Sequence, residues 1–186
     1  MNKKKIAFFI KQIFKEIGED TERSGLLDTP NRIAKMYEEI FRGYDETQKP
    51  KITVFENNND GIAYDDIVTD EGCFNSFCEH HMALFSGKYY FGYIAGNKVM
   101  GLSKVARVVD YFSAKLQIQE RLGRDIIKYI EEIVQPKGCV LMLEASHSCK
   151  SVRGVKKEGK MRTIITTGLF REEPILEQKF ISLVKN

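Results

Sequence analysis

The sequence lacks tryptophan altogether, and its 186 residues include only four prolines, four cysteines and three histidines. It also lacks an apolar run of the roughly 18 residues that a membrane-spanning helix requires. The apolar stretch Ile6–Ile10 is soon interrupted by lysine, unlike the core of a secretory signal. We therefore expect a cytoplasmic protein with no membrane partner.

Charge and cysteine content argue against two further classes of protein. The net charge of +3 is too small to indicate nucleic-acid binding. Four cysteines could form two disulfides, but in a cytoplasmic protein metal binding or burial is the more common fate. Cys73 and Cys139 are predicted to be buried thiols, since Cys139 begins an apolar segment.

The remaining composition is that of an ordinary globular domain, with 42% hydrophobic and 30% charged residues. Apolar residues three and four positions apart predict helices, and β-branched and aromatic runs predict strands. The predicted helices cover residues 5–18, 30–41, 102–112 and 116–134, with a short helix from Pro174, and the predicted strands cover residues 51–55, 89–94, 99–100, 140–145 and 163–170. This order of helices, antiparallel strands, a helix pair and two further strands indicates an α+β fold.

Local signals predict several boundaries of these elements. Thr29 is expected to be the N-cap of the second helix, because Pro30 suits the first helical position. Gly43 is expected to end that helix. Residues 57–61 are expected to form a loop.

All three histidines lie near cysteines. His80 and His81 follow Cys78 closely, and His147 precedes Cys149 by two residues. Thiolates and imidazole suit Zn²⁺, so Cys78, His81 and Cys149 are a candidate set of three zinc ligands. Three ligands leave the fourth position for water, as in catalytic sites, whereas a fourth ligand from His80 or His147 would make a structural site, and the spacing favours neither. In an open site, His80 and His147 could transfer protons.

A second group of candidate residues is cationic. Arg32 and Lys35 lie three residues apart on one predicted helix. Lys104 and Arg107 have the same spacing on another, and residues three apart share a helix face. Ser103 lies near the N-terminus of the predicted helix 102–112, where free N–H groups can bind an anion. Together these residues could hold a polyphosphate, although a solvated helix face is the more common role of such pairs.

Two charged residues outside these pairs are further candidates. Arg153 follows the segment with His147 and Cys149 closely and could join the same polyphosphate site. Glu120 is expected on a charged helix face, although its carboxylate could also accept a pair of N–H groups from a base.

Taken together, the motifs resemble those of GTP cyclohydrolase I of the zinc-dependent type. A single motif would be a weak signal, whereas six in the order typical of that family are a strong one. The matching segments span about residues 26–170 and are Asp28–Met36, Ser76–His81, Gly101–Lys104, Arg107–Val109, Leu116–Leu122, and His147–Cys149 followed by Arg153–Val155.

The resemblance implies a hydrolase that opens GTP at C8 of guanine, releases formate and forms 7,8-dihydroneopterin triphosphate, the first step of pterin and folate biosynthesis. It implies that zinc is held by Cys78, His81 and Cys149. His147 would protonate the imidazole ring of the base, and His80 would assist later proton transfers at the ribose. The implied substrate contacts are Glu120 with Gln119 at the guanine, and Arg32, Lys35, Ser103, Lys104, Arg107 and Arg153 at the triphosphate, with Ser103 also taking part in the rearrangement.

The resemblance also implies the tunnelling fold, an antiparallel sheet with a helix pair on one face. Residues 1–45 would form an N-terminal helical segment and residues 46–186 the catalytic domain. Subunits of this family join their sheets into a barrel, and two pentamers stack into a decamer, which removes the exposed sheet edges of a single chain. The active sites would lie between subunits.

Two enzyme branches of the same fold fit less well. The deazaguanine reductase branch uses a cysteine nucleophile and NADPH without this set of ligands, and the pyruvoyltetrahydropterin synthase branch usually binds zinc through three histidines. A zinc-stabilised oligomeric binding module without turnover is the alternative of a different class. It requires a closed metal site and no consumption of GTP.

Several positions depart from the pattern typical of the family, and none is a predicted ligand or acid–base residue. Lys150 places a charge beside the expected ligand Cys149, where an apolar residue is more usual. The other departures are Leu84, Ala95, Lys115, Gly159 and Met161.

Overall fold

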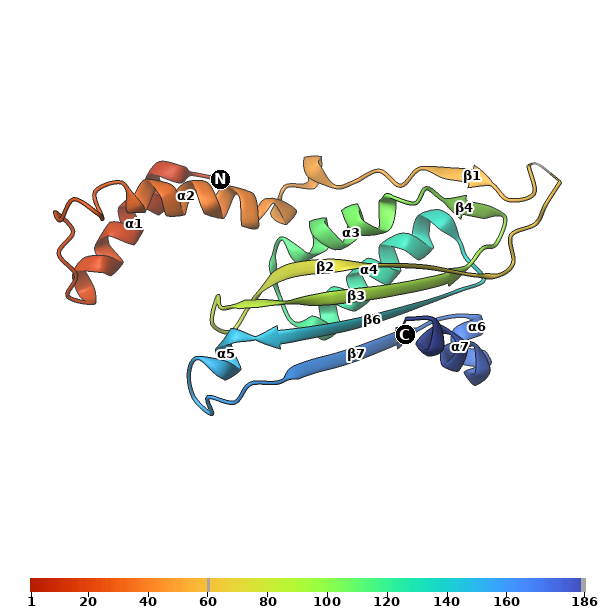
Figure 1. The fold of residues 1–186 in the computed structure, drawn as a ribbon. Coiled ribbons are helices and arrows are strands. Elements are labelled where there is room, and N and C mark those ends of the chain that lie inside the picture. The colour runs from red at the N-terminus through yellow and green to blue at the C-terminus, as the bar shows by residue number, and fades with distance from the viewer. Residues whose placement is uncertain (60, 185–186) are drawn as a thin grey trace.

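The computed structural model describes residues 1–59 and 61–184, and its centre is a curved five-stranded sheet (Figure 1). The strand order is β5-β2-β3-β6-β7, with every neighbouring pair antiparallel except β5 and β2. A separate two-stranded ribbon pairs β1 with β4. The strands are β1 (Val54–Glu56), β2 (Ile67–Cys78), β3 (Leu84–Ile94), β4 (Lys98–Met100), β5 (Leu116–Gln117), β6 (Gly138–His147) and β7 (Lys160–Thr166).

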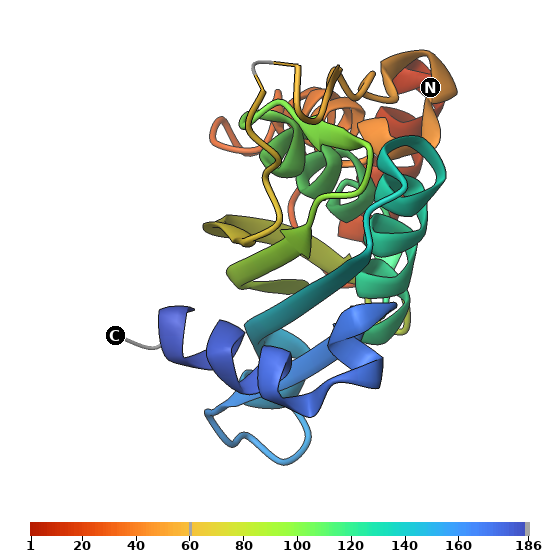
Figure 2. The same cartoon turned by 90° about the vertical axis from the view of Figure 1, so that its right-hand side faces the viewer.

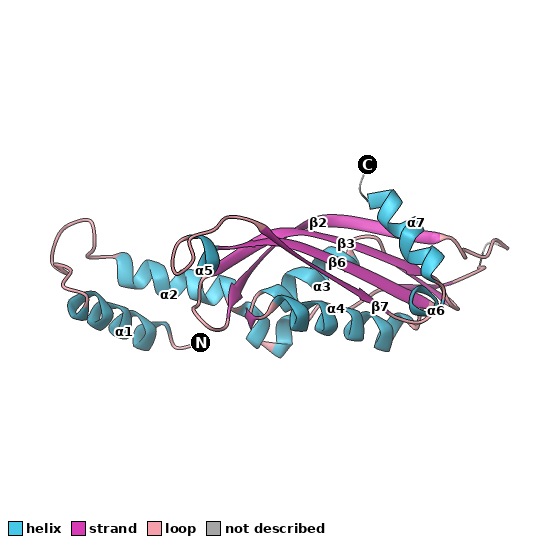
Figure 3. Ribbon diagram, turned by 90° about the horizontal axis from the view of Figure 1, so that it is seen from below, coloured by secondary structure: helices cyan, strands magenta, loops and turns pink. Residues whose placement is uncertain are grey.

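Two helices, α3 (Lys104–Ser113) and α4 (Gln119–Val134), cover one face of this sheet (Figures 2 and 3). Alternation along β6 explains the arrangement, because Cys139, Leu141 and Leu143 are fully buried in the core cluster that contains α3 and α4. The predicted α+β class, the helix pair on one face and the buried Cys139 thiol are confirmed. Both helices begin later than predicted, and Leu116–Gln117 instead pairs with β2 as β5.

A smaller core lies on the opposite face, where Val140 packs with Phe170 and Phe180. These aromatic residues belong to α6 (Leu169–Glu172) and α7 (Pro174–Val184). The predicted strand 163–170 is therefore wrong at its end, because β7 stops at Thr166. Gly168 causes the turn: it has a φ of +49°, and a Cβ there would lie 2.2 Å from the Lys137 carbonyl oxygen.

The outer strands leave two open edges in a single chain. Within the described residues, β2 has no strand partner on its outer side between residues 67 and 76, and β7 has none on its outer side. Cys73 lies on this part of β2 and is exposed, so its predicted burial is wrong. The alternation that buries Phe74 and Ser76 turns Cys73 to the other face.

The N-terminal helices α1 (Lys3–Glu16) and α2 (Thr29–Ile40) pack on each other and stand away from the sheet (Figure 1). The 3₁₀ turn Arg42–Tyr44 follows α2 and leads to the rest of the chain. The Gly43 amide donates to the Ala114 carbonyl at 3.0 Å, and a Cβ at Gly43 would lie 2.3 Å from the Tyr111 carbonyl oxygen. Glycine is therefore required where this segment docks.

Several predicted boundaries in this half of the chain need correction. Thr29 is not the N-cap of α2: Asp28 is, and the Thr29 hydroxyl donates back to the Gly25 carbonyl. Gly43 does not end α2, which stops at Ile40. The predicted strand 51–55 begins only at Val54. Asp60, in the predicted loop 57–61, lies outside the described residues. A 3₁₀ turn, Glu46–Gln48, and the short α5, Ser148–Ser151, complete the elements described.

None of the helices in the described part of the chain combines the length and apolarity that crossing a bilayer requires.

The pairing of β3 with β6 depends on Gly87, which gives a testable consequence. A Cβ at Gly87 would lie 1.8 Å from the Glu144 carbonyl oxygen on the facing strand. Replacing Gly87 with alanine should therefore lower the free energy of unfolding by about 1–3 kcal/mol. The urea midpoint of unfolding measures this change.

Gly101→Ala is the matched control, because its added Cβ would meet its nearest neighbours at 3.6 Å, an ordinary contact. Equal midpoints for the two variants would contradict the proposed clash at the strand pair.

Candidate metal centre and active site

The three predicted zinc ligands converge at one end of the sheet. Cys78 is the last residue of β2, and His81 follows in a tight turn closed by a 2.8 Å hydrogen bond from the Met82 amide to the Cys78 carbonyl. Cys149 lies in α5, immediately after β6. The ligand atoms of Cys78, His81 and Cys149 lie within 4.8 Å of one another, so these residues can hold a metal ion.

The donor set and its spacing suit a tetrahedral ion. Two thiols and one imidazole are typical zinc ligands, at about 2.0–2.3 Å from the metal. Cys78 Sγ lies 3.8 Å from His81 Nδ1, a separation that such bond lengths allow across one ion. Burial and the neighbouring Cys78 thiol raise the pKa of Cys149. A bound cation would oppose this effect, because it stabilises the thiolate.

Arg153 also contacts this cluster. Its Nη1 lies 2.6 Å from His81 Nε2, so Arg153 donates and Nε2 accepts. In a neutral ring the proton then resides on Nδ1, which faces Cys78. A metal ion on Nε2 would displace Arg153, and one on Nδ1 would require the loss of that proton. In this arrangement of side chains, Arg153 and a metal ion would therefore compete for His81.

His147 lies half-buried beside the cluster and is held on two sides. Phe85, its partner across β3 and β6, stacks on the ring with centroids 4.7 Å apart and planes inclined by 2°. His147 Nε2 lies 2.9 Å from the side-chain oxygen of Gln119. Burial lowers the pKa of His147, Glu120 opposes this shift, and Lys150 adds to it.

The turn that carries the histidines is braced by a network that the sequence did not predict. Arg121, in the first turn of α4, donates to the Glu79 carboxylate and, at 3.0 Å, to the Leu116 carbonyl. The Glu79 amide in turn donates to the Gln117 carbonyl at 3.1 Å. His80 Nε2 lies 3.9 Å from Glu79. Arg121 occurs within a recognised motif, but only the folded chain gives it a partner. Phe85 was also missed, since nothing in its local sequence indicates stacking.

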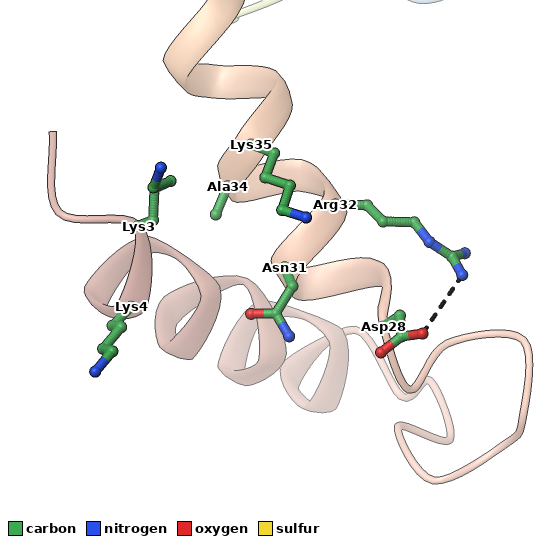
Figure 4. Close-up of a pocket in the computed structure, with 7 residues that line it drawn as sticks. All are labelled: Lys3, Lys4, Asp28, Asn31, Arg32, Ala34 and Lys35. Carbon is green, nitrogen blue, oxygen red and sulfur yellow. Dashed lines mark ion pairs between the residues drawn. The ribbon is translucent and has the colours of Figure 1, made fainter.

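The predicted phosphate contacts are dispersed within one chain. Arg32 and Lys35 line an open hollow of about 430 Å³ with Asn31, formed by α1, α2 and the residue before α2 (Figure 4). The Arg32 guanidinium points to Asp28, 3.6 Å away. These two cations therefore lie on the N-terminal helices, apart from the Cys-His-Cys cluster on the sheet (Figure 1).

The cations of α3 lie toward the other end of the sheet. Leu102, next to Ser103, lines a small pocket with Val68 and Asp70 near the start of β2. Cys78 is eight residues beyond Asp70 on the same strand, which corresponds to about 26 Å along it. Ser103 and Lys104, at the beginning of α3, are therefore distant from the metal ligands of the same chain, and Arg107 lies only one turn farther along. Of the predicted phosphate contacts, the structure brings only Arg153 to the cluster.

The fold and the cluster define an α+β protein whose Cys-His-Cys group can hold a metal ion beside a stacked histidine. Comparison with known proteins identifies this class more closely. The model of the family described as GTP cyclohydrolase I matches residues 6–185. The chain belongs to this family.

Relatives of similar length support the assignment. GTP cyclohydrolase 1 of Wolinella succinogenes is 41% identical over 192 residues, with 100% of both chains covered. The enzyme of that name from Bacillus pumilus is 40% identical, covering 100% of this chain and 98% of its own, and that from Helicobacter pylori strain Shi470 is 36% identical, covering 96% and 98%. The crystal structure of apo archaeosine synthase QueF-Like covers 55% of this chain and 93% of its own, with 16% identity and a TM-score of 0.45, a likeness too low to carry an argument.

Proposed function

We propose that this protein is a hydrolase that opens GTP at C8 of the guanine, releases formate and forms 7,8-dihydroneopterin triphosphate. The observation that carries the proposal is the convergence of Cys78, His81 and Cys149 next to His147, in a chain of the GTP cyclohydrolase I family. The reaction needs a nucleophile at carbon and an acid at nitrogen, because hydroxide attack alone leaves negative charge on the ring. The cluster and the histidine are suited to these two tasks.

Zinc is the proposed metal, because two thiolates and an imidazole are its typical ligands. Bound there, zinc would lower the pKa of a water molecule to about 7 and so supply a nucleophile at neutral pH. The three residues Cys78, His81 and Cys149 would hold it, leaving one coordination position open. The remaining chemistry falls to the side chains around the cluster.

His147 is the proposed acid that protonates the imidazole ring of the guanine. Its stacking on Phe85 and its hydrogen bond to Gln119 hold the ring in one orientation, which favours proton transfer to a fixed substrate. His80 is exposed in the turn between the ligands and is proposed to assist the later proton transfers at the ribose. Ser103 is proposed to take part in that rearrangement from a neighbouring subunit.

The substrate would be bound by groups of opposite charge at its two ends. Glu120 is proposed to accept the N–H groups of the guanine, with its neighbour Gln119 in the same first turn of α4. Arg153 would approach the phosphates from the cluster side. The other proposed phosphate contacts are Arg32, Lys35, Ser103, Lys104 and Arg107, which neighbouring subunits would supply.

An oligomer is proposed for two reasons. The cations at the start of α3 are distant from the cluster of their own chain, and β2 and β7 each have an open edge. Joining the β2 edge of one subunit to the β7 edge of the next would close a barrel and bring the parts of the site together. A decamer of two pentamers in the cytoplasm is the proposed assembly, with residues 1–45 as a helical segment and residues 46–186 as the catalytic unit.

Formate and pterin measured together test the proposed function. Zinc-loaded protein incubated with GTP should release formate and should yield a product that fluoresces as a pterin after oxidation. Formate without a pterin would limit the reaction to ring opening and contradict the roles of His80 and Ser103. Neither signal, from assembled protein with bound metal, would overturn the proposal in favour of a binding module without turnover.

Two impaired variants, assayed at low GTP, should restore each other if the site lies between subunits. His147→Ala removes the proposed acid, and Lys104→Ala removes a phosphate contact from the neighbouring chain. Refolded together in equal amounts, they should form intact sites at roughly a quarter of interfaces and recover formate release in proportion.

A mixture of His147→Ala with Cys149→Ala is the matched control, since both changes affect the cluster side and no interface gains an intact set. Failure of the His147→Ala and Lys104→Ala mixture to recover activity, despite normal assembly, would place the whole site within one chain.

A further inference from the structure

Gln119 is a buried amide with an orientation fixed by the protein. It is the first residue of α4 and only 1% exposed. Its side-chain nitrogen donates to the Leu143 carbonyl at 3.0 Å, the Met161 carbonyl at 3.2 Å and the Thr163 hydroxyl at 3.2 Å. Because the two carbonyls only accept hydrogen bonds, the amide nitrogen must face the sheet and the amide oxygen must face away from it.

That oxygen faces His147. His147 Nε2 lies 2.9 Å from Gln119 Oε1, and an amide oxygen accepts hydrogen bonds but does not donate them. The hydrogen bond therefore requires a proton on Nε2. Phe85, which is fully buried, stacks in parallel on the ring and restricts its rotation. Within the described residues, His147 Nδ1 has no hydrogen-bond partner.

We infer that Gln119 is a positioning residue that holds His147 as the Nε2–H tautomer, so that Nδ1 is the nitrogen that exchanges a proton with the substrate. The inference rests on the proposed function for the identity of the substrate. It replaces the guanine contact expected for the Gln119 side chain, whose hydrogen-bonding groups already have partners in the protein. The guanine contact then falls to Glu120 alone.

The proton balance is simple in this arrangement. In the imidazolium form both ring nitrogens carry a proton. The Nδ1–H bond breaks as the proton passes to a nitrogen of the guanine imidazole ring, and the bonding electron pair stays on Nδ1. His147 is then neutral with its proton on Nε2, the form that Gln119 stabilises, and water returns a proton to Nδ1 before the next turnover. No tautomer exchange is needed within the cycle.

The tautomer can be observed directly because the chain has only three histidines. Long-range ¹⁵N–¹H spectra of zinc-loaded, histidine-labelled protein without GTP, at a pH where His147 is neutral, should show its proton on Nε2. The spectrum of His147→Ala identifies the signals by their loss. A proton on Nδ1, or a mixture of tautomers in the unaltered protein, would overturn the inference. This measurement does not depend on turnover, so it stands even if GTP is not the substrate.

Kinetics distinguish a positioning residue from a contact to the base. Gln119→Leu should lower kcat for formate release by about 10- to 100-fold, part of the roughly 10²–10⁴-fold effect of a positioned acid, and should leave KM unchanged. The His147 spectrum of this variant should become a mixture of tautomers. Glu120→Gln is the comparison, because loss of the proposed guanine contact should raise KM. A raised KM with an unchanged kcat in Gln119→Leu would contradict the positioning role and would indicate that Gln119 contacts the guanine.

Discussion

Cys149→Ala should lose the bound metal and formate release together. The variant leaves two of the three converging ligands, Cys78 and His81, and His81 lies at the surface. If the site is open, as proposed, no fourth protein ligand compensates, so loss of one of the three candidate ligands should remove much of the metal affinity. Elemental analysis after dialysis, with formate release from GTP on the same sample, measures both effects.

Cys73→Ala is the matched control, since Cys73 is exposed on β2 and lies outside the cluster. It should retain both metal and activity. A Cys149→Ala protein that releases formate at the normal rate without metal would refute the role of the cluster. Full metal occupancy in that variant would instead show that Cys149 is not a ligand.

The same cluster should bind metal more weakly as the pH falls. A ligand thiol must lose its proton, and burial together with Cys78 raises the pKa of Cys149. More of this thiol is therefore protonated at a given pH than is usual for cysteine. The apparent metal affinity should fall by up to about tenfold per pH unit for each thiol proton released. Competition with a chelator at several pH values gives the slope.

His147→Ala should keep the metal and lose ring opening. His147 lies outside the group of three candidate ligands, so metal content should be unchanged. Removal of a general acid typically lowers the rate by about 10²–10⁴-fold. Single-turnover formate release, measured on protein with its metal content determined, separates this loss from loss of the metal.

His80→Ala provides the contrast, because His80 is proposed to act after the ring has opened. It should release formate and accumulate little pterin, whereas His147→Ala should produce neither. Normal formate release by His147→Ala would refute the acid assignment. Loss of both products in His80→Ala would mean that His80 acts at or before ring opening.

The sequence predicts elements well where the pattern is local. Cys78 and His81 are three residues apart, and a tight turn brings them together without help from distant residues. Cys149 is far along the chain, and its place in the candidate set came from its donor type and from the resemblance to a family, not from its spacing to this pair. The structure supplies the physical reason, since the register of β3 and β6 sets His147 opposite Phe85 and so delivers Cys149 to the end of β2.

Non-local contacts explain what the sequence could not predict. The alternation on β2 decides the exposure of Cys73, and spacing alone does not reveal which face is buried. The end of β7 depends on the close approach of Gly168 to Lys137. Similarly, Arg107 and Lys104 belong to recognisable motifs, but their distance from the cluster follows from the direction of α3 along the sheet.

The open edges of β2 and β7 also bear on how copies of this chain assemble. Pairing the β2 edge of one copy with the β7 edge of another would be a head-to-tail contact, and each added copy would cover one open edge and supply one new one. Such growth ends only when the last edge meets the first. Whether such copies form a closed ring or an open filament therefore depends more on the curvature of the sheet than on the chemistry of its edges. A substitution that flattens the sheet should convert a ring into a filament.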